Sequence, residues 1–380
     1  MNITCAPQDL SAALKIVGPA VNHSPAVLPV LGNVLLSTLG NGALAVSASN
    51  LEIGIRTRIQ AGVIDRGEIT VPALALTNLV ALLTGDVTLG IPDEVATLRL
   101  VSGRTKANIK GIPAQEFPFI PDYADLKFQA GLPTLTLAPA GLERALDRTV
   151  FAAATDDSRP ILTGVYLHAQ ESGLTFAAVD GTRLSVQTTL CPAADFPSLI
   201  IPAPALREVS RLLANETEPV LLVVNGAGTQ AAFLFSDTQL VTQLIPGNFP
   251  DYSAIIPSGH TATITVSPTA LRRALQGALV FSGGYAARLT TWIVGEDSLT
   301  ITGADAETGD MTTPIGVTVE TAGEPVANLL LNGRYVLDLL QAIGNDTDRV
   351  EICLTTPTSP ILFRLPGDDF YAHVIMPQTR

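Results

Sequence analysis

The chain contains an internal repeat of about 130 residues, and this repeat limits the folds that it can adopt. A pattern with Leu, Ala and Leu at positions i, i+3 and i+4 begins at Leu10, Leu142 and Leu271. This spacing places the three side chains on one face of a helix. Three further landmarks return in the same order: a strand end at Asn50, Asp180 and Asp305, a helix start near Pro72, Pro202 and Asn332, and a strand end before Pro113, Pro246 and Pro377. The chain is therefore expected to hold three related units, each of domain size.

Each unit is predicted to contain two helices and about eight short strands. So few helices among so many strands favour an α+β fold, in which the helices gather on one face of antiparallel sheets. Proline-rich linkers at 113–132 and 247–252 separate the units. The predicted domains are 1–130, 131–256 and 257–380.

The charges are unevenly distributed. The formal net charge of −13 argues against a protein that simply coats DNA. The predicted helices nevertheless carry eight basic and five acidic residues, whereas the rest of the chain holds 14 basic and 30 acidic ones. Two interpretations remain open. The helices either present an ordinary solvated face or share a surface that faces a polyanion.

The motifs of enzymes and metal sites are missing from the sequence. The four histidines lack metal-ligand spacing, and 226–231 is better read as a hairpin turn than as a dinucleotide loop. Asp156, Asp157 and Asp305 are assigned to turns. We therefore expect no catalytic activity, no cofactor and no metal. Three scattered cysteines favour a reducing cytoplasm, and the sequence shows neither a signal peptide nor a membrane span.

Seven short motifs resemble the bacterial DNA sliding clamp, the β subunit of DNA polymerase III. They run through the whole chain in that family's order and are together highly specific. The motifs are Leu28–Asn33, Ser102-Gly103-Arg104, Ser158-Arg159-Pro160, Val179–Leu184, Phe249-Pro250-Asp251-Tyr252, Tyr335-Val336-Leu337-Asp338 and Val374–Pro377.

The resemblance implies a head-to-tail homodimer with the DNA clamp fold, a ring of six domains with helices around a central hole. Such a ring encircles duplex DNA without reading its sequence, tethers other proteins and does no chemistry. The implied partners are duplex DNA, a DNA polymerase catalytic subunit, an ATP-dependent clamp loader, and other replication and repair proteins that carry short clamp-binding peptides.

The resemblance also implies two sets of site residues. The first lines a groove for partner peptides: Leu162, Thr182, Arg183, Leu184, Pro250, Ile255, Tyr335, Ser359, Val374 and Met376. The second faces DNA: Arg104, Lys106, Arg144, Arg148, Arg159, Arg207, Arg211, Arg272, Arg273 and Arg288.

Several positions that are often basic in the family are not basic here. Pro204, Thr182 and Ser253-Ala254 occupy such positions. This favours an alternative hypothesis, a clamp-fold paralogue that binds partner peptides but associates poorly with DNA. A third hypothesis, an enzyme on a repeated scaffold, lacks a catalytic constellation to support it.

Overall fold

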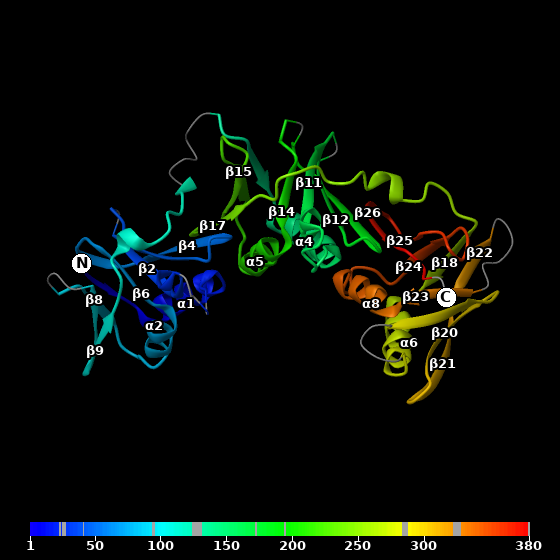
Figure 1. The fold of residues 1–380 in the computed structure, drawn as a ribbon, viewed down its shortest axis with the longest axis horizontal. Coiled ribbons are helices and arrows are strands. Elements are labelled where there is room, and N and C mark those ends of the chain that lie inside the picture. The colour runs from blue at the N-terminus through cyan, green and yellow to red at the C-terminus, as the bar shows by residue number, and fades with distance from the viewer. Residues whose placement is uncertain are drawn as a thin grey trace. The chain divides into compact units, whose positions relative to one another are not determined.

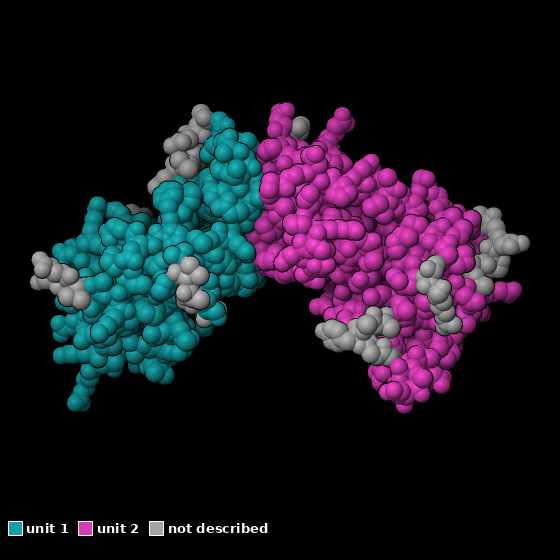
Figure 2. All heavy atoms as spheres, in the orientation of Figure 1, with its two compact units in different colours: residues 1–139, 208–244 teal, residues 140–207, 245–380 magenta. Residues whose placement is uncertain are grey.

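The computed structural model describes residues 1–22, 24, 28–40, 42–92, 96–123, 131–171, 173–193, 195–282, 288–321 and 328–378. The chain forms two compact units (Figure 2): unit 1 holds residues 1–139 and 208–244, and unit 2 holds residues 140–207 and 245–380. The described residues form six α-helices, which Figure 1 labels: α1 (Pro7–Val17), α2 (Ala73–Val80), α4 (Pro139–Thr149), α5 (Ala203–Leu213), α6 (Pro268–Val280) and α8 (Gly333–Ala342).

Unit 1 contains two antiparallel sheets. One has the strand order β5-β1-β7-β8-β9 and the other β10-β15-β16-β17-β4-β3-β2-β6. The strands are β1 (Asn2–Cys5), β2 (Asn33–Thr38), β3 (Ala43–Ser49), β4 (Ile53–Gln60), β5 (Gly62–Asp65), β6 (Glu68–Pro72), β7 (Val87–Gly90), β8 (Thr97–Ser102), β9 (Thr105–Lys110), β10 (Thr134–Leu137), β15 (Val220–Val224), β16 (Gln230–Leu234) and β17 (Thr238–Gln243). Helices α1 and α2 pack together, and α1 also covers β3 and β4.

Unit 2 repeats this plan. Its sheets have the orders β14-β11-β12-β13-β26-β25-β24-β18-β22 and β21-β20-β19-β23. The strands are β11 (Gly164–Gln170), β12 (Gly173–Val179), β13 (Arg183–Thr189), β14 (Leu199–Pro202), β18 (Ala262–Val266), β19 (Leu289–Val294), β20 (Ser298–Asp305), β21 (Gly309–Gly316), β22 (Thr318–Thr321), β23 (Asn328–Asn332), β24 (Val350–Leu354), β25 (Ile361–Leu365) and β26 (Asp368–Ile375).

The repeat predicted from the sequence is visible in the element order. Each copy begins with one strand and one helix, continues with a three-strand meander and one or two further strands, and ends with a second helix and another three strands. The predicted α+β class, with helices on antiparallel sheets, is confirmed.

Helix–sheet packing in the third copy shows how the sequence sets these layers. Leu271, Ala274 and Leu275 of α6 are buried beside Trp292, whose indole Nε1 donates a hydrogen bond to the Thr290 Oγ1 at 2.9 Å. Strand β20 approaches the end of α6 so closely that a Cβ on Gly303 would lie 1.8 Å from the carbonyl oxygen of Ala278. Glycine is therefore required at this contact.

Two strand pairs join neighbouring copies of the repeat edge to edge. In unit 1, β4 pairs with β17, and in unit 2, β13 pairs with β26. Both pairs join the third strand of a first meander to the last strand of the following copy. These junctions merge separate sheets into the eight-stranded and nine-stranded sheets.

Candidate functional site

The junction between β13 and β26 brings together two motifs that lie far apart in the sequence. Arg183 pairs with Ile375 and Leu184 with Val374 in antiparallel register. Beyond the paired residues, the Met376 amide donates to the Thr182 carbonyl at 2.8 Å. The pairing therefore unites the predicted groove residues of 182–184 with those of 374–376.

An apolar cluster lies under this junction. Leu162, Leu184 and Val374 are buried in it, at 7%, 0% and 1% exposure, and Ile255 packs against it partly buried. Pro250 is exposed, and Tyr335 and Met376 are half-buried. Of the predicted groove residues, the half-buried and exposed side chains are therefore the accessible ones, and the buried ones pack in the cluster.

Ser359, another predicted groove residue, is also not part of this cluster. It lies in the turn between β24 and β25, where its Oγ is 2.6 Å from the Thr356 Oγ1. Its backbone amide also bonds to that hydroxyl. These contacts give Ser359 a role in shaping the turn.

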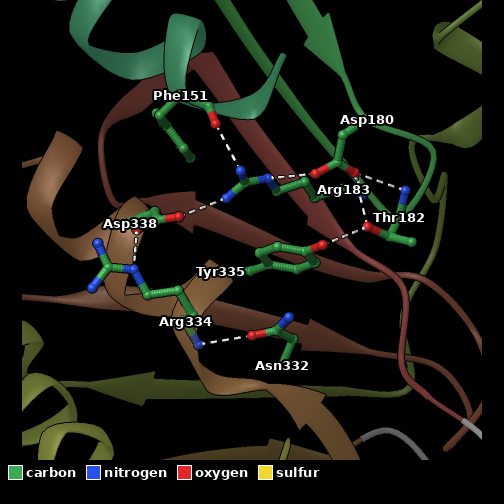
Figure 3. Close-up of polar contacts among 8 residues, drawn as sticks. All are labelled: Phe151, Asp180, Thr182, Arg183, Asn332, Arg334, Tyr335 and Asp338. Atoms are coloured by element: carbon green, nitrogen blue, oxygen red, sulfur yellow. Dashed lines mark hydrogen bonds and ion pairs between the residues drawn. The ribbon is translucent and has the colours of Figure 1, made fainter. Parts of the chain in front are cut away.

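Arg183 forms the centre of a polar network among the predicted groove residues (Figure 3). Its Nε donates to the Asp180 Oδ2 at 2.9 Å and its Nη1 to the Asp338 Oδ2 at 2.8 Å. Nη2 donates to the carbonyl oxygen of Phe151 at 2.7 Å. The guanidinium also lies over the Tyr335 ring, 4.3 Å from its centroid. These contacts hold the Arg183 guanidinium in one position next to Tyr335.

Local turn and cap chemistry positions this network. The Asp180 Oδ1 accepts hydrogen bonds from the amides of Thr182 and Arg183, which closes the turn at Gly181, where φ is +97°. The Asn332 Oδ1 caps α8 by accepting from the Arg334 amide at 3.0 Å.

The start of α8 then fixes two groove-side residues. Tyr335 and Asp338 lie three positions apart and so share one side of the helix. Thr182 donates from its hydroxyl to the Tyr335 Oη at 3.1 Å, and the Asp338 Oδ1 pairs with Arg334 at 2.9 Å. Phe151 and Asp338 were not predicted as site residues. Asp338 could have been predicted, because a residue three positions after Tyr335 lies on the same side of the helix.

Burial and hydrogen bonding shift several pKa values around the groove. Burial, with the nearby Tyr166 and Asp251, raises the pKa of Tyr252 to about 12, and its Oη lies 2.6 Å from the His168 Nε2. Hydrogen bonds from Ser253 lower the pKa of Asp251. Burial, and then the positive charge of Arg183, lowers the pKa of His373 to about 3. His373 is therefore neutral at physiological pH.

The basic residues predicted to face DNA differ in their exposure. Arg211 pairs with Glu208 at 2.7 Å and donates to the Ile16 carbonyl, and Arg272 donates to the Leu340 carbonyl. Arg288 is half-buried. The exposed members of the set are Arg104, Lys106, Arg144, Arg159, Arg207, Arg211 and Arg273.

Arg148 cannot face DNA, so this prediction is wrong. It is 3% exposed, and its Nη1 donates to the Gln187 Oε1 at 2.8 Å and to the Asp368 Oδ2 at 2.6 Å. Its Nη2 pairs with Asp346 at 3.1 Å. The guanidinium also lies over the Tyr371 ring. Arg148 is therefore buried in ion pairs with two carboxylates from the third copy of the repeat, Asp346 and Asp368.

The turns assigned from the sequence are confirmed. The Asp156 Oδ1 accepts from the Ser158 amide, and the Asp305 Oδ1 accepts from the amides of Glu307 and Thr308. Residues 226–229 connect β15 and β16 as a hairpin. Within the described ranges, no group of three or more His, Cys, Asp or Glu side chains could hold a metal ion. Nor does the described part of the chain contain a helix long and apolar enough to cross a membrane.

Solved structures with this architecture are DNA clamps. The beta sliding clamp of C. crescentus matches with a TM-score of 0.89 at 29% identity, and the alignment covers 100% of both chains. The DNA polymerase sliding clamp of Pseudomonas aeruginosa, solved with a ligand, also matches with a TM-score of 0.89, at 26% identity and full coverage of both chains. The fold and its strand junctions thus define a three-domain protein of the DNA clamp class.

Sequence comparison identifies the family. Models of the N-terminal, central and C-terminal domains of the DNA polymerase III beta subunit match residues 1–121, 136–251 and 253–379. The beta sliding clamp of Synechococcus elongatus is 32% identical over 387 residues, which cover 99% of each chain. That of Caulobacter vibrioides is 29% identical over 97% of each chain. The chain therefore belongs to the DNA polymerase III beta subunit family, the beta sliding clamps.

Proposed function

We propose that this sliding clamp works as a head-to-tail homodimer, closed into a ring around duplex DNA, with domain boundaries near residues 130 and 256. The observation that carries the proposal is the repeated strand junction. The third strand of the first copy pairs with the last strand of the second copy, and the same holds from the second copy to the third. The corresponding pair between the third copy and the first copy is not formed within one chain. Strand β21 of the third copy and β9 of the first copy both end their sheets.

The exposed edges β21 and β9 suit each other as partners in two chains. A sheet edge offers unpaired amide and carbonyl groups, which a second chain can satisfy. Strand β9 carries the exposed Lys106 and Lys110, whereas β21 carries the exposed Asp310 and follows the exposed Glu307. Charges of opposite sign on the two edges favour this pairing over self-association of either edge. We therefore assign Lys106 to the dimer contact in preference to DNA.

The tethering role rests on the groove beside β13 and β26. Its half-buried apolar side chains lie above a packed cluster, next to polar groups held by Arg183. Apolar walls with a few fixed polar groups suit capture of a short peptide. The peptides would come from a DNA polymerase catalytic subunit, from an ATP-dependent clamp loader and from other replication and repair proteins. Free cysteines at 5, 191 and 353 suit a cytoplasmic location.

The experiment is a measurement of solution mass by light scattering. The wild-type chain is expected to be a dimer at micromolar concentration. Reversing both charges in Lys106→Glu/Lys110→Glu should produce monomers, because two acidic edges would then repel each other. Lys15→Glu, an exposed lysine on α1, is the matched control and should remain dimeric. A wild-type monomer, or a double variant as dimeric as the control, would refute the proposed interface.

A further inference from the structure

The β4–β17 junction of unit 1 has the same backbone frame as the peptide groove of unit 2. Ile53 pairs with Thr242 there, as Arg183 pairs with Ile375 in unit 2. One residue further on, the Gln243 amide donates to the Glu52 carbonyl at 3.2 Å, and this bond matches the one from Met376 to Thr182. Glu52 therefore occupies the position of Thr182, and Gln243 that of Met376.

A linker crosses each junction in the same way. Phe117-Pro118 in unit 1 corresponds to Phe249-Pro250 in unit 2. In unit 1 this linker and the paired strands enclose an open cavity of about 110 Å³. Its lining includes Leu51, Glu52, Phe119 and Gln243. The volume is well below the ~300–1,000 Å³ of a small-molecule site and suits a single side chain.

Leu51 has an unusual backbone conformation at this cavity. Its φ is +77°, in the left-handed region that disfavours residues with a Cβ. The equivalent position in unit 2 is Gly181, with φ of +97° and no such conflict. Leucine occupies this position in unit 1 despite the strain, its side chain is 52% exposed, and it lines the cavity. Such an outlier at a cavity points to a functional role for the side chain.

The surroundings of the cavity define what it can hold. Phe119 is 88% exposed beside Leu51, so two large apolar side chains border the opening. Glu52 is exposed and is the charged member of the described lining. The nearby Arg56 and Arg58 are both paired with Asp122, at 2.8 and 3.2 Å, and leave the Glu52 carboxylate to face a visitor.

The floor differs from that of the groove in unit 2. Gly54 stands where unit 2 has Leu184, and the Ile120 side chain fills the space, 3.1 Å from where a Cβ on Gly54 would be. Val241 is apolar like Val374, but Gln243 and Gln230 bring amide groups to the lining. The two junctions thus share a frame and differ in chemistry.

We propose that the β4–β17 junction is a second peptide-binding site, which takes an extended segment of a partner protein with one apolar side chain next to a lysine or arginine. The apolar side chain enters the cavity between Leu51 and Phe119, and the cation pairs with Glu52. The inference rests on the proposed function, because it extends peptide capture from one junction of the repeat to the other. Each chain of the clamp would then hold two partners of different sequence.

The probe is a fluorescein-labelled hexapeptide, Gly-Gly-Lys-Leu-Gly-Gly, with Gly-Gly-Glu-Leu-Gly-Gly as its charge-reversed control, both measured by fluorescence anisotropy with the full-length clamp. The lysine peptide should bind with a dissociation constant of ~1 mM, the tightest binding that one buried side chain and one exposed ion pair allow. Leu51→Gly should weaken it about tenfold, and Glu52→Gln about threefold. Leu51→Gly should fold without loss of melting temperature, because it relieves the strain at φ +77°.

Met376→Ala, in the groove of unit 2, is the matched control and should leave binding of the lysine peptide unchanged. Three outcomes would overturn the second site. The lysine peptide does not bind, the glutamate peptide binds equally well, or Leu51→Gly leaves binding of the lysine peptide unchanged. If Met376→Ala abolishes it, the probe occupies the groove of unit 2, so the second site fails while the proposed function stands. Failure of the proposed function has a separate sign, a wild-type monomer in the mass measurement.

Discussion

Arg144 and Arg148 show how neighbours on one helix can have different roles. They lie one turn apart on α4, yet Arg144 is exposed and Arg148 is buried against Gln187, Asp346 and Asp368. Removing one partner of a buried ion pair leaves the opposite charge uncompensated. Arg148 therefore stabilises the contact between α4 and the last copy of the repeat, while Arg144 remains available to a ligand.

This difference gives the first prediction. Arg148→Ala should destabilise the folded chain by ~3–5 kcal/mol, whereas Arg144→Ala should change stability by less than ~0.5 kcal/mol. Urea unfolding followed by circular dichroism measures both. Equal midpoints for the two variants would mean that the ion pairs around Arg148 do not stabilise the fold.

His373 gives a prediction about pH. Its imidazole is fully buried between the rings of Phe151 and Phe363, and its pKa falls from 6.5 to about 3 on folding. Below pH 6.5 the unfolded chain binds a proton that the folded chain does not bind until about pH 3. Stability should therefore fall as the pH is lowered through 6.5, by at most ~1.4 kcal/mol for each pH unit from this group.

His373→Leu removes the titrating group and should flatten the loss of stability between pH 7 and 5. Phe363→Leu, which alters the same packing without removing a proton site, should keep the wild-type slope. Unfolding midpoints at a series of pH values measure the three proteins. A His373→Leu variant that loses stability as steeply as the wild type would contradict the assignment.

Residue-scale prediction from sequence succeeded where neighbours in the chain decide the outcome. The strand end predicted at Asp180 and the helix start predicted near Asn332 coincide with a turn and a cap that local hydrogen bonds form. Arg148 was misassigned because its partners, Asp346 and Asp368, lie 198 and 220 positions away. Spacing along one helix carries no information about carboxylates that a distant segment supplies.

At the scale of elements, the helices are the candidate DNA surface. Arg144 of α4, Arg207 of α5 and Arg273 of α6 are exposed, and each lies on a helix in an otherwise acidic chain. Contacts between such side chains and phosphates are diffuse, exchange readily and do not depend on base sequence. That behaviour is what sliding along a duplex requires.

The helix surface gives the third prediction. A triple variant, Arg144→Ala/Arg207→Ala/Arg273→Ala, should weaken binding to nicked duplex DNA and lower the slope of log K against log salt by ~0.9 for each arginine–phosphate pair that the substitutions remove. The control removes two exposed strand arginines, in Arg99→Ala/Arg364→Ala, and should change neither quantity. An unaltered salt slope in the triple variant would place DNA elsewhere on the molecule.

The elements themselves were predictable because the sequence pattern of each one occurs three times in the chain. A strand–helix start, a meander and a second helix recur at fixed spacing, and the structure contains them in each copy. The pairing of edges was harder to predict. Alternation within β4 or β13 specifies which face is buried, but not which distant strand adds to its edge. Strand β13 pairs with β26 only because two folded domains bring these strands side by side.

At the scale of the whole molecule, the proposed mechanism is topological. A closed ring stays on DNA without tight contacts, because it can leave the duplex only at a free DNA end. The modest number of exposed arginines on the helices fits such a mechanism, since strong phosphate binding would slow sliding. The stability of the ring would then come from the β9–β21 edges, and partner affinity from the groove. DNA binding, ring stability and partner affinity would therefore be separable by mutation.

Retention on circular DNA is the last prediction. The clamp, loaded by a clamp loader with ATP onto a nicked circular plasmid, should remain bound through gel filtration at a salt concentration that abolishes the direct binding of clamp to short duplex DNA. Cutting the plasmid once should release it, because the ring can slide off the new ends. The Arg144→Ala/Arg207→Ala/Arg273→Ala variant should still be released only by cutting, whereas Lys106→Glu/Lys110→Glu should not be retained, since an open edge cannot close the ring. Retention that survives linearisation would show that affinity for DNA holds the clamp, and equal retention of the edge variant would show that closure at β9 and β21 is not required.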